Sequence, residues 1–539
     1  MSIHRLLLLI LAVTLCCGVA SDGRAAVHEQ MAVHVRSMAM GNAVTAYPPG
    51  TLAVHYNPAG LTNLKGTHLE TGLAYANLEL TDRFTAPANY KGFFGETNDH
   101  VIGTEATTRS GAMYIPFHGP TSNLMGGYMG MSYRKPGSRW ALGYGFYAPY
   151  GVGLEFPSGP AVYGAQFGYN ERLVYAGPGA AYRLTDKLSI GASIGLGLGA
   201  EGLRIEMRAP NDIVALTGVL GEITKDLEDE ITLGIIPMPL FGGGLAPFEG
   251  QGTLTADEMV DNFVPSFNLG LLWEPFQWLS LGAVYQSEAR GELSGYYRLE
   301  YGDRWRRMMD WLVANELLKV ISEAFGLPTN GGIPADEGRA STEYVWPRRV
   351  QLGVMLRPIE NLRLTFDLHW ANWSVAEADK FVFDHNLQVL KVAKLLAYEH
   401  APNVLVLERH MRDTWHWSAG MEFQATSWFA FRCGYEDRKS STNPDYYDMT
   451  FSLPDLRIYS VGFGTRLGNL GIDMWNEVEL DITGMLIQGD DVSFHQGEKV
   501  SSNLNTNELT AIMYNPYSGL NFDQEVSGWA ISTGVSINW

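Results

Sequence analysis

After its first 25 residues the sequence has no apolar run of about 20 residues, so it offers no transmembrane helix. Of its three cysteines, Cys16 and Cys17 lie in an apolar N-terminal segment, and Cys433 alone cannot form an internal disulfide. Basic residues are scarce, because 38 Lys and Arg stand against 58 Asp and Glu and give a net charge of −20. Nucleic-acid-binding proteins are normally basic, so we expect no nucleic-acid partner. Frequent glycine (60 residues) and 12% aromatic residues instead favour β-structure with tight turns.

Residues 1–25 have the pattern of a secretory signal peptide. A polar start is followed by the apolar core Leu6–Leu15 and then by small residues from Gly18 onward. Lipoprotein processing at Cys16 is disfavoured, because the preceding Leu15 is bulky where a small residue is needed. The segment predicts export from the cytoplasm.

The last eleven residues, Trp529–Trp539, alternate between an apolar face and a face of small or polar residues, with tryptophan at both ends. Successive side chains of a strand point to opposite faces, and a membrane-spanning strand needs about 9–11 residues with aromatic residues at both interfaces. The segment therefore predicts a membrane strand. A half-buried strand of a soluble sandwich is the alternative for this segment alone.

Connection lengths along the chain decide between these two interpretations. Six predicted connections are tight, and every other connection, such as 206–262 or 291–344, is long. Strict alternation of short and long connections along an even number of strands is typical of outer-membrane barrels. We therefore predict a 14-stranded antiparallel transmembrane β-barrel with strands near 67–81, 123–135, 138–150, 169–184, 187–205, 263–274, 277–290, 345–357, 361–373, 413–425, 427–437, 455–467, 471–487 and 527–539.

Charged residues alternate with apolar ones on several of these strands. Lipid cannot solvate charges, so Arg349, Arg363 and Arg432 are expected to face the barrel interior. Such arginines could bind a substrate carboxylate through two parallel hydrogen bonds. Pairing with the inward acids is the favoured alternative, and the candidate partners are Asp367, Glu422 and Glu436.

The long connections contain predicted helices. Residues Asp303–Phe325 carry one apolar helical face, with Asp303 as N-cap and Gly326 and Pro328 as stop signals. Residues 212–227 and 384–398 also have helical patterns, and Thr255 with Glu258 matches a capping box. Apolar helical faces outside a barrel must pack together or cover hydrophobic material.

No pattern in the sequence indicates an enzyme, a metal site or a cofactor. Gly191–Gly195 matches the G-x-S-x-G hydrolase motif, but the match lies in an alternating glycine-rich strand rather than in a strand-turn-helix. The 13 histidines lack metal-ligand spacing. A lipid-modifying barrel enzyme that uses His369, His416 and Glu422 remains the alternative from another functional class.

Two N-terminal motifs carry a resemblance to a known family. Arg36–Ala43 reads R-S-M-A-M-G-N-A, and Tyr56–Leu61 reads Y-N-P-A-G-L. Together with the strand pattern, Leu453–Gly462 and the terminal Trp539, they resemble the FadL/TodX (OmpP1) family over nearly the whole mature chain. Members of this family transport long-chain fatty acids and other hydrophobic compounds across the outer membrane.

The resemblance implies a domain organisation. It places a signal peptide at 1–25, an N-terminal hatch inside the barrel at 26–66 and the barrel at 67–539. The hatch motif corresponds to Asn57, Pro58, Ala59 and Gly60.

The resemblance also implies a transport path. Ligand would be captured in an apolar groove between the loops 206–262 and 291–344, for which the candidate residues are Trp305, Met308, Met309, Leu312 and Leu317. It would leave sideways through a gap beside the third strand, where Pro149, Gly151 and Gly153 weaken strand pairing. The alternative is that Pro149 simply ends this strand.

These interpretations predict passive transport, because no energy-coupling motif is visible. The expected partners are hydrophobic small molecules, outer-membrane lipid and lipopolysaccharide, and the barrel-assembly machinery that would recognise Trp539. We expect a monomer in the bacterial outer membrane. An adhesin or structural barrel is a further alternative.

Overall fold

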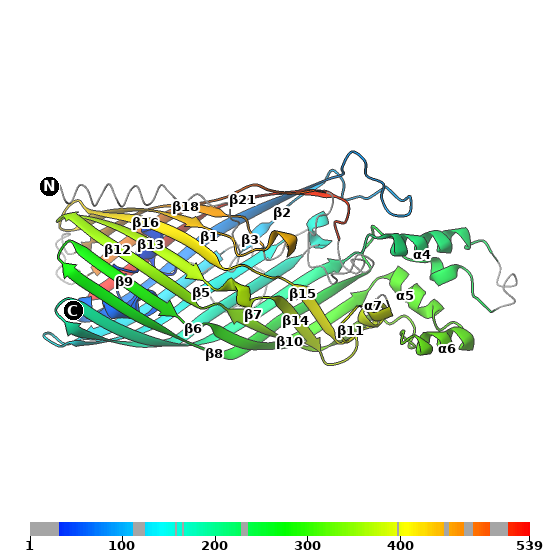
Figure 1. The fold of residues 1–539 in the computed structure, drawn as a ribbon, viewed down its shortest axis with the longest axis horizontal. Coiled ribbons are helices and arrows are strands. Elements are labelled where there is room, and N and C mark those ends of the chain that lie inside the picture. The colour runs from blue at the N-terminus through cyan, green and yellow to red at the C-terminus, as the bar shows by residue number, and fades with distance from the viewer. Residues whose placement is uncertain are drawn as a thin grey trace.

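The computed structural model describes residues 32–111, 124–156, 159–163, 166–227, 235–395, 398–446, 452–467, 478–495 and 516–539. Within these residues the chain forms a closed antiparallel β-barrel of fourteen strands, with helices gathered beyond one end (Figure 1). The predicted fold class is therefore confirmed. The predicted signal peptide at 1–25 lies outside the described residues.

Several wall strands are interrupted once, so more strand segments than wall strands are labelled. In wall order they are β1 (Gly66–Thr85), β4 (Leu124–Arg134), β5 (Trp140–Glu155), β6 (Phe167–Thr185), β7 (Leu188–Met207), β8 (Gly252–Phe276), β9 with β10 (Leu279–Gln286, Ala289–Tyr301), β12 with β11 (Arg349–Ile359, Ala335–Trp346), β13 with β14 (Leu362–Ala371, Ala378–Phe383), β16 with β15 (Thr414–Gln424, Val404–Glu408), β17 (Phe429–Arg438), β18 (Leu456–Arg466), β19 (Val478–Gly489) and β21 (Asn521–Asn538). Short segments extend this wall as β2 (Glu105–Thr107), β3 (Arg109–Gly111) and β20 (Val492–Phe494).

The C-terminal strand closes the barrel against the first strand. β21 pairs with β1 from His68↔Asn538 to Thr85↔Asn521, and Thr67 and Trp539 exchange two backbone hydrogen bonds of 2.8 and 3.0 Å. In its last part, Trp529, Ile531, Val535 and Ile537 are exposed on the outer wall, whereas Ala530, Ser532 and Ser536 are buried. The face that the alternation predicts to contact lipid is therefore the outer face.

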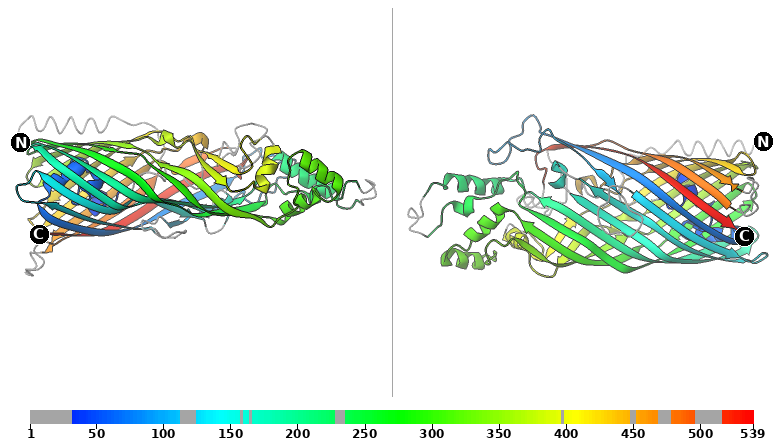
Figure 2. Two further views of the ribbon diagram at one scale, coloured as in Figure 1. Left: turned by 90° about the horizontal axis from the view of Figure 1, so that it is seen from below. Right: turned by 180° about the vertical axis from the view of Figure 1, so that it is seen from behind.

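The tight turns lie at the end of the barrel that also holds the C-terminus, and the helices lie beyond the other end (Figure 2). Five of the six predicted tight connections are present, at 135–139, 186–187, 277–278, 360–361 and 425–428. The sixth, at 468–470, lies outside the described residues. Among the described helices, none has the length and the apolar character needed to cross a membrane.

The predicted long loops are shorter than expected, because the strands continue past the apolar span. β8 begins at Gly252 inside the predicted loop 206–262, and β10 and β11 occupy much of the predicted loop 291–344. The outer face of β10 carries exposed charges, and Arg290 donates to Glu343 at 2.7 Å. Hydrocarbon cannot solvate such charges, so these extensions stand above the bilayer. Their charged outer faces explain why apolar alternation missed them.

Two helix predictions are corrected. The capping-box match at Thr255 and Glu258 lies within β8, where Glu258 has a φ of +52° at an irregularity of strand pairing. Asp303–Phe325 forms two helices instead of one, because Asn315 caps a second helix by accepting a hydrogen bond from the Leu318 amide. The helices of this end are α4 (Asp212–Ile223), α5 (Asp303–Trp311), α6 (Glu316–Ala324) and α7 (Gln388–Leu395), so the predicted helices near 212–227 and 384–398 are confirmed.

The N-terminal segment from residue 32 fills the barrel interior at the end that holds the tight turns (Figure 1). It contains α2 (Val35–Ala39), α3 (Ala53–Tyr56) and the short helix η1 (Pro58–Asn63). α2 packs against β17, β18 and β19, whereas η1 packs against β5 to β8 on another part of the wall. We call residues 32–64 the hatch; the predicted domain bounds of 26–66 and 67–539 stay a prediction.

Inward-facing glycines of the wall leave space for the hatch. A Cβ at Gly191 would lie 2.3 Å from the carbonyl carbon of Pro58, and one at Gly434 would lie 2.0 Å from the amide nitrogen of Gly41. The hatch backbone therefore touches the wall backbone directly at these points. Other wall glycines whose Cβ would lie within 3.0 Å of a hatch atom are Gly130, Gly143, Gly145, Gly179, Gly270, Gly282, Gly353, Gly420, Gly462 and Gly534.

We predict that Gly434→Ala destabilises the protein by about 1–3 kcal/mol, because a methyl group has no space against the Gly41 backbone. The matched control is Gly484→Ala, since a Cβ at Gly484 meets nothing within 4 Å. Urea or thermal unfolding in a bilayer mimetic measures the difference. Equal stability of the two variants would contradict the role of Gly434.

Candidate functional site

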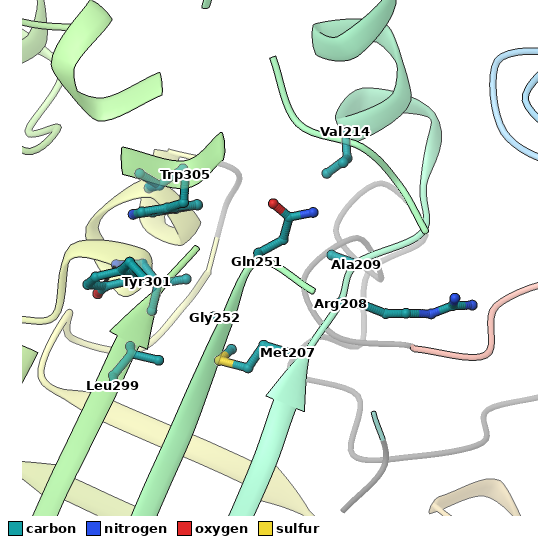
Figure 3. Close-up of a pocket in the computed structure, with 11 residues that line it drawn as sticks. Met207, Arg208, Ala209, Val214, Gln251, Gly252, Leu299, Tyr301 and Trp305 are labelled. Atoms are coloured by element: carbon teal, nitrogen blue, oxygen red, sulfur yellow. Dashed lines mark hydrogen bonds between the residues drawn. The ribbon is translucent and has the colours of Figure 1, made fainter. Parts of the chain in front are cut away.

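An apolar pocket of about 610 Å³ opens where the helices meet the upper ends of β7, β8 and β10 (Figure 3). Its walls come from strand ends and from α4, α5 and α7, which are far apart in the sequence. The lining residues are Met207, Arg208, Ala209, Val214, Gln251, Gly252, Leu299, Tyr301, Trp305, Val389 and Val392. We call this the mouth pocket.

Two aromatic rings form one wall of the mouth pocket. Tyr301 and Trp305 stack with ring centroids 5.6 Å apart and planes 13° from parallel. The Tyr301 hydroxyl donates to Asp336 at 2.5 Å, and the Trp305 indole nitrogen donates to Gln388 at 3.2 Å. Burial and the neighbouring Asp336 carboxylate raise the pKa of Tyr301, so its hydroxyl keeps its proton. Because these polar atoms are already bonded, the wall offers apolar ring faces.

Arg208 lines the pocket only with its stem, and Figure 3 shows its charged end pointing away. The guanidinium makes two hydrogen bonds of 2.8 and 2.6 Å to the buried Asp99 carboxylate and a third of 2.6 Å to the Pro516 carbonyl. It also lies 5.0 Å from the Tyr163 ring and 5.8 Å from the Phe248 ring. One buried cation therefore holds four separate connections together at the mouth.

The predicted groove residues occupy three different environments. Trp305 lines the mouth pocket, whereas Met308 and Met309 are buried in the core beneath it and Leu312 is half-buried against that core. Leu317 is 50% exposed on α6 and does not line the mouth pocket. The prediction of a capture site in these residues thus rests on Trp305.

The predicted hatch motif is held by contacts with the wall and with the rest of the hatch. The Asn57 amide donates to the Thr45 carbonyl at 2.8 Å and to the Leu271 carbonyl of β8 at 3.1 Å, and its oxygen accepts from the Ala59 amide at 3.1 Å. Pro58 and Ala59 lie against Gly191, where side chains are excluded. A Cβ at Gly60 would lie 2.2 Å from Pro48, so Gly60 lets two hatch turns approach each other.

Strand β5 passes through the predicted lateral-opening residues with incomplete pairing. It continues beyond Pro149 to Glu155, so Pro149 does not end the strand. Its pairing with β4 stops at Tyr147, and its pairing with β3 begins at Gly153. Between them, at 148–152, no strand among the described residues pairs with β5 on this side, and the pairing with β6 shifts register at the same height.

The three predicted luminal arginines separate into two groups. Arg363 and Arg432 both bind Glu422, at 2.6 and 2.7 Å, and Arg432 also binds Asp481 at 2.5 Å. The predicted pairing with Glu422 is thus present for these two. Arg349 donates to the Tyr150 hydroxyl at 3.1 Å. Of the other expected acids, Asp367 accepts from the Thr45 amide of the hatch, and Glu436 pairs with Arg438.

A second cavity, of about 330 Å³, lies in the lumen beside the hatch and is polar where the mouth pocket is apolar. Its lining includes His55 of the hatch and Tyr150 of β5. Arg172 also lines it and donates to Ser266 at 2.6 Å.

The local sequence gives no sign that Arg172, Arg208 and Gln251 line these cavities, because nothing in it shows that distant elements meet there. The small inward residues of the wall can be found in the sequence, because glycine or serine occupies every second position from Gly191 to Gly199.

The fold and these sites can now be compared with known proteins. The profile of the family described as "Outer membrane protein transport protein (OMPP1/FadL/TodX)" matches residues 13–539. The chain belongs to this family. The family comprises outer-membrane transporters of hydrophobic compounds and not enzymes, so the predicted localisation and the absence of an enzymatic role follow from membership. A search of curated protein sequences gives no match.

Solved structures with this fold include three transport proteins. A Pseudomonas aeruginosa FadL homologue has a TM-score of 0.66 at 15% identity, with 95% of this chain and 99% of that chain covered. The Pseudomonas putida toluene transporter TodX has a TM-score of 0.58 at 15% identity, with coverage of 95% and 100%. The Ralstonia pickettii toluene transporter TbuX has a TM-score of 0.52 at 17% identity, with coverage of 92% and 96%.

Family membership agrees with the geometry of the residues that suggested an enzyme. Ser193 lies within β7 and donates to the Val54 carbonyl of the hatch at 2.6 Å, so its hydroxyl fastens the hatch. His369 and His416 stack at 4.6 Å in the lumen wall. Across the described residues, no three His, Cys, Asp or Glu side chains form a group that could hold a metal ion.

We predict that Arg432→Gln destabilises the protein by about 3–5 kcal/mol, because it leaves Glu422 and Asp481 buried without this partner. Arg83→Gln is the control, because Arg83 also contacts two acids but is exposed, so this variant should lose far less stability than Arg432→Gln. Denaturant unfolding of both variants provides the measurement. Similar losses for both would show that the luminal pairs have no special role.

Proposed function

We propose that this transporter moves long-chain fatty acids or other hydrophobic compounds by passive diffusion. Ligand enters at the mouth pocket, passes along the lumen beside the hatch and leaves sideways into the membrane near β5. Rearrangement of the hatch opens the inner part of this route. The observation that supports the proposal is that, among the described residues, no strand pairs with β5 at 148–152 on the β4 side, beside a hatch that fills one end of the barrel.

The hatch favours a sideways exit over a straight one. Its residues are buried, and its backbone meets wall glycines on both sides of the barrel, as at Gly191 and Gly434. A hydrophobic molecule that continued along the axis would also have to displace the ion pairs of Arg36 with Glu479 and Asp481. An opening of the wall beside β5 would instead lead from the lumen to hydrocarbon. Apolar transfer is favourable by roughly 0.8 kcal/mol per CH2 group, so no energy source is required.

The mouth pocket supports capture of apolar molecules. It is concave, it lies at the end of the barrel away from the tight turns, and its lining is almost entirely apolar. Among the candidate luminal arginines, Arg363 and Arg432 are neutralised by Glu422 and Asp481. A role of Arg349, Arg363 and Arg432 in holding a substrate carboxylate stays a prediction. The Tyr150 partner of Arg349 lines the polar luminal cavity.

The proposal includes the surroundings of the barrel. We expect a monomer that contacts outer-membrane lipid and lipopolysaccharide and that is inserted by the barrel-assembly machinery. Trp539 supports the last expectation, because it is an exposed aromatic residue at the end of the closing strand.

Uptake of labelled oleate into vesicles tests the transport proposal. Vesicles that contain the protein should take up oleate faster than protein-free vesicles. A deletion of residues 27–64 should also admit small polar solutes, because the lumen then lacks its hatch. Equal oleate uptake with and without the full-length protein would refute the transport of fatty acids.

We predict that Ala148→Trp lowers oleate uptake about tenfold or more without changing ligand capture at the mouth. Ala148 is buried in the unpaired stretch of β5, so a large ring there would obstruct the gap. Leu142→Trp on the same strand is the control, because Leu142 is 56% exposed on the outer wall. Unchanged uptake by Ala148→Trp would argue for an exit along the barrel axis.

A further inference from the structure

Gln251 is the one lining residue of the mouth pocket that sends an amide into its centre (Figure 3). Its backbone is fixed on both sides. The Gln251 amide donates to the Met207 carbonyl at 2.6 Å, and the Gln251 carbonyl accepts from the Gly302 amide at 2.8 Å. The Gln251 side chain is thus anchored between the ends of β7 and β10.

The hydrogen bonds of the Gln251 side chain fix which atom faces the pocket. Nε2 donates to the Ala246 carbonyl at 2.8 Å and to the Glu249 carbonyl at 3.0 Å. A carbonyl oxygen in that place would face two other oxygens, so the nitrogen must lie there. The Oε1 atom is turned toward the Trp305 side in Figure 3. It is buried, and none of the described residues donates to it.

A buried acceptor without a donor is unfavourable, so a ligand that supplies a donor gains affinity there. The rest of the pocket offers such a ligand only apolar contact. Tyr301 and Trp305 present ring faces, because their polar atoms bind Asp336 and Gln388. The site therefore combines one hydrogen-bond acceptor with walls that suit hydrocarbon.

The surrounding charges disfavour an anionic ligand. The guanidinium of Arg208 points away from the pocket and is held by Asp99. Asp336 lies behind Tyr301, and Gln251 Oε1 itself would repel a carboxylate oxygen. The net charge of −20 also opposes the approach of anions at long range.

We propose that the mouth pocket binds uncharged hydrophobic molecules that carry a hydroxyl group, such as phenols and long-chain alcohols, through donation to Gln251 Oε1. Their hydrocarbon part packs on Tyr301 and Trp305. This inference rests on the proposed function and names the ligand class that its capture site prefers.

A shape-matched ligand series tests the inference with full-length protein in lipid nanodiscs. The probes are radiolabelled para-butylphenol, para-butylanisole and para-butylbenzoate, which carry a donor, no donor and a negative charge. Equilibrium dialysis measures binding, and partition into protein-free nanodiscs is subtracted. We expect the phenol to bind about fivefold to tenfold more tightly than the anisole, as one hydrogen bond would give, and the benzoate to bind most weakly.

Gln251→Met is the decisive variant, because it removes the acceptor and retains much of the side-chain volume. The variant should bind the phenol and the anisole with about equal affinity. Its affinity for the anisole should stay close to that of the unmodified protein. Gln424→Met is the matched control, since Gln424 bonds to the Thr426 and Phe429 carbonyls at the opposite end of the barrel. It should retain the full preference.

The possible outcomes separate this inference from the proposed function. Equal binding of phenol and anisole to the unmodified protein, or tightest binding of the benzoate, overturns the hydroxyl preference and leaves hydrophobic capture intact. A preference that persists in Gln251→Met overturns the role of Gln251. If none of the probes binds beyond the protein-free nanodiscs, capture at the mouth itself is refuted. The comparison of the three probes on the unmodified protein stands even if a variant fails to fold.

Discussion

Direct contact between the hatch backbone and the barrel wall is the constraint on which the rest of this structure depends. The hatch has little regular structure, so its backbone groups need partners from elsewhere. The wall provides them: Thr483 donates to the Val35 carbonyl at 2.8 Å, and Ser193 donates to the Val54 carbonyl at 2.6 Å. Such short side chains reach the hatch only because neighbouring wall positions are glycine, which lets the two backbones come close. The hatch therefore has one well-defined position in the barrel.

Ion pairs between the hatch and the wall also hold the hatch in this position. Arg36 of α2 binds Glu479 and Asp481 of β19, and Asp481 is shared with Arg432. Burial makes these pairs costly to break, because each partner would be left without compensation. An apolar substrate gains nothing by displacing these pairs. The sideways route that we propose instead leaves the lumen at the stretch of β5 that pairs with no described strand on the β4 side.

The sequence predicted the elements whose signal is local. Alternating strands, tight turns and helices near 212–227 and 384–398 follow from periodicity and from turn residues within each segment. A pattern of apolar residues on the outer face does not reveal the strand extensions, because the outer faces of these segments are charged. The break before Asn315 is not evident from periodicity either, because the apolar face continues across it. Asn315 is the N-cap of a second helix there.

Contacts between distant segments could not be predicted in the same way. Arg432 was expected to pair with an inward acid, and it binds Glu422, which lies directly opposite on the neighbouring strand. Its second partner, Asp481, depends on closure of the barrel and on the position of α2. The bond between Arg208 and Asp99 joins loops more than a hundred residues apart, and no spacing in the sequence indicates it.

The Arg208 contact explains how a pocket built from connecting segments can be preformed. Loops normally lose conformational freedom when they bind a ligand, and that loss reduces affinity. Here the buried guanidinium ties four connections together before any ligand arrives, through Asp99, Pro516, Tyr163 and Phe248. The same contact neutralises the cation and turns it away from the pocket. For the ligand capture that we propose at the mouth, this contact leaves burial of hydrocarbon as the source of affinity.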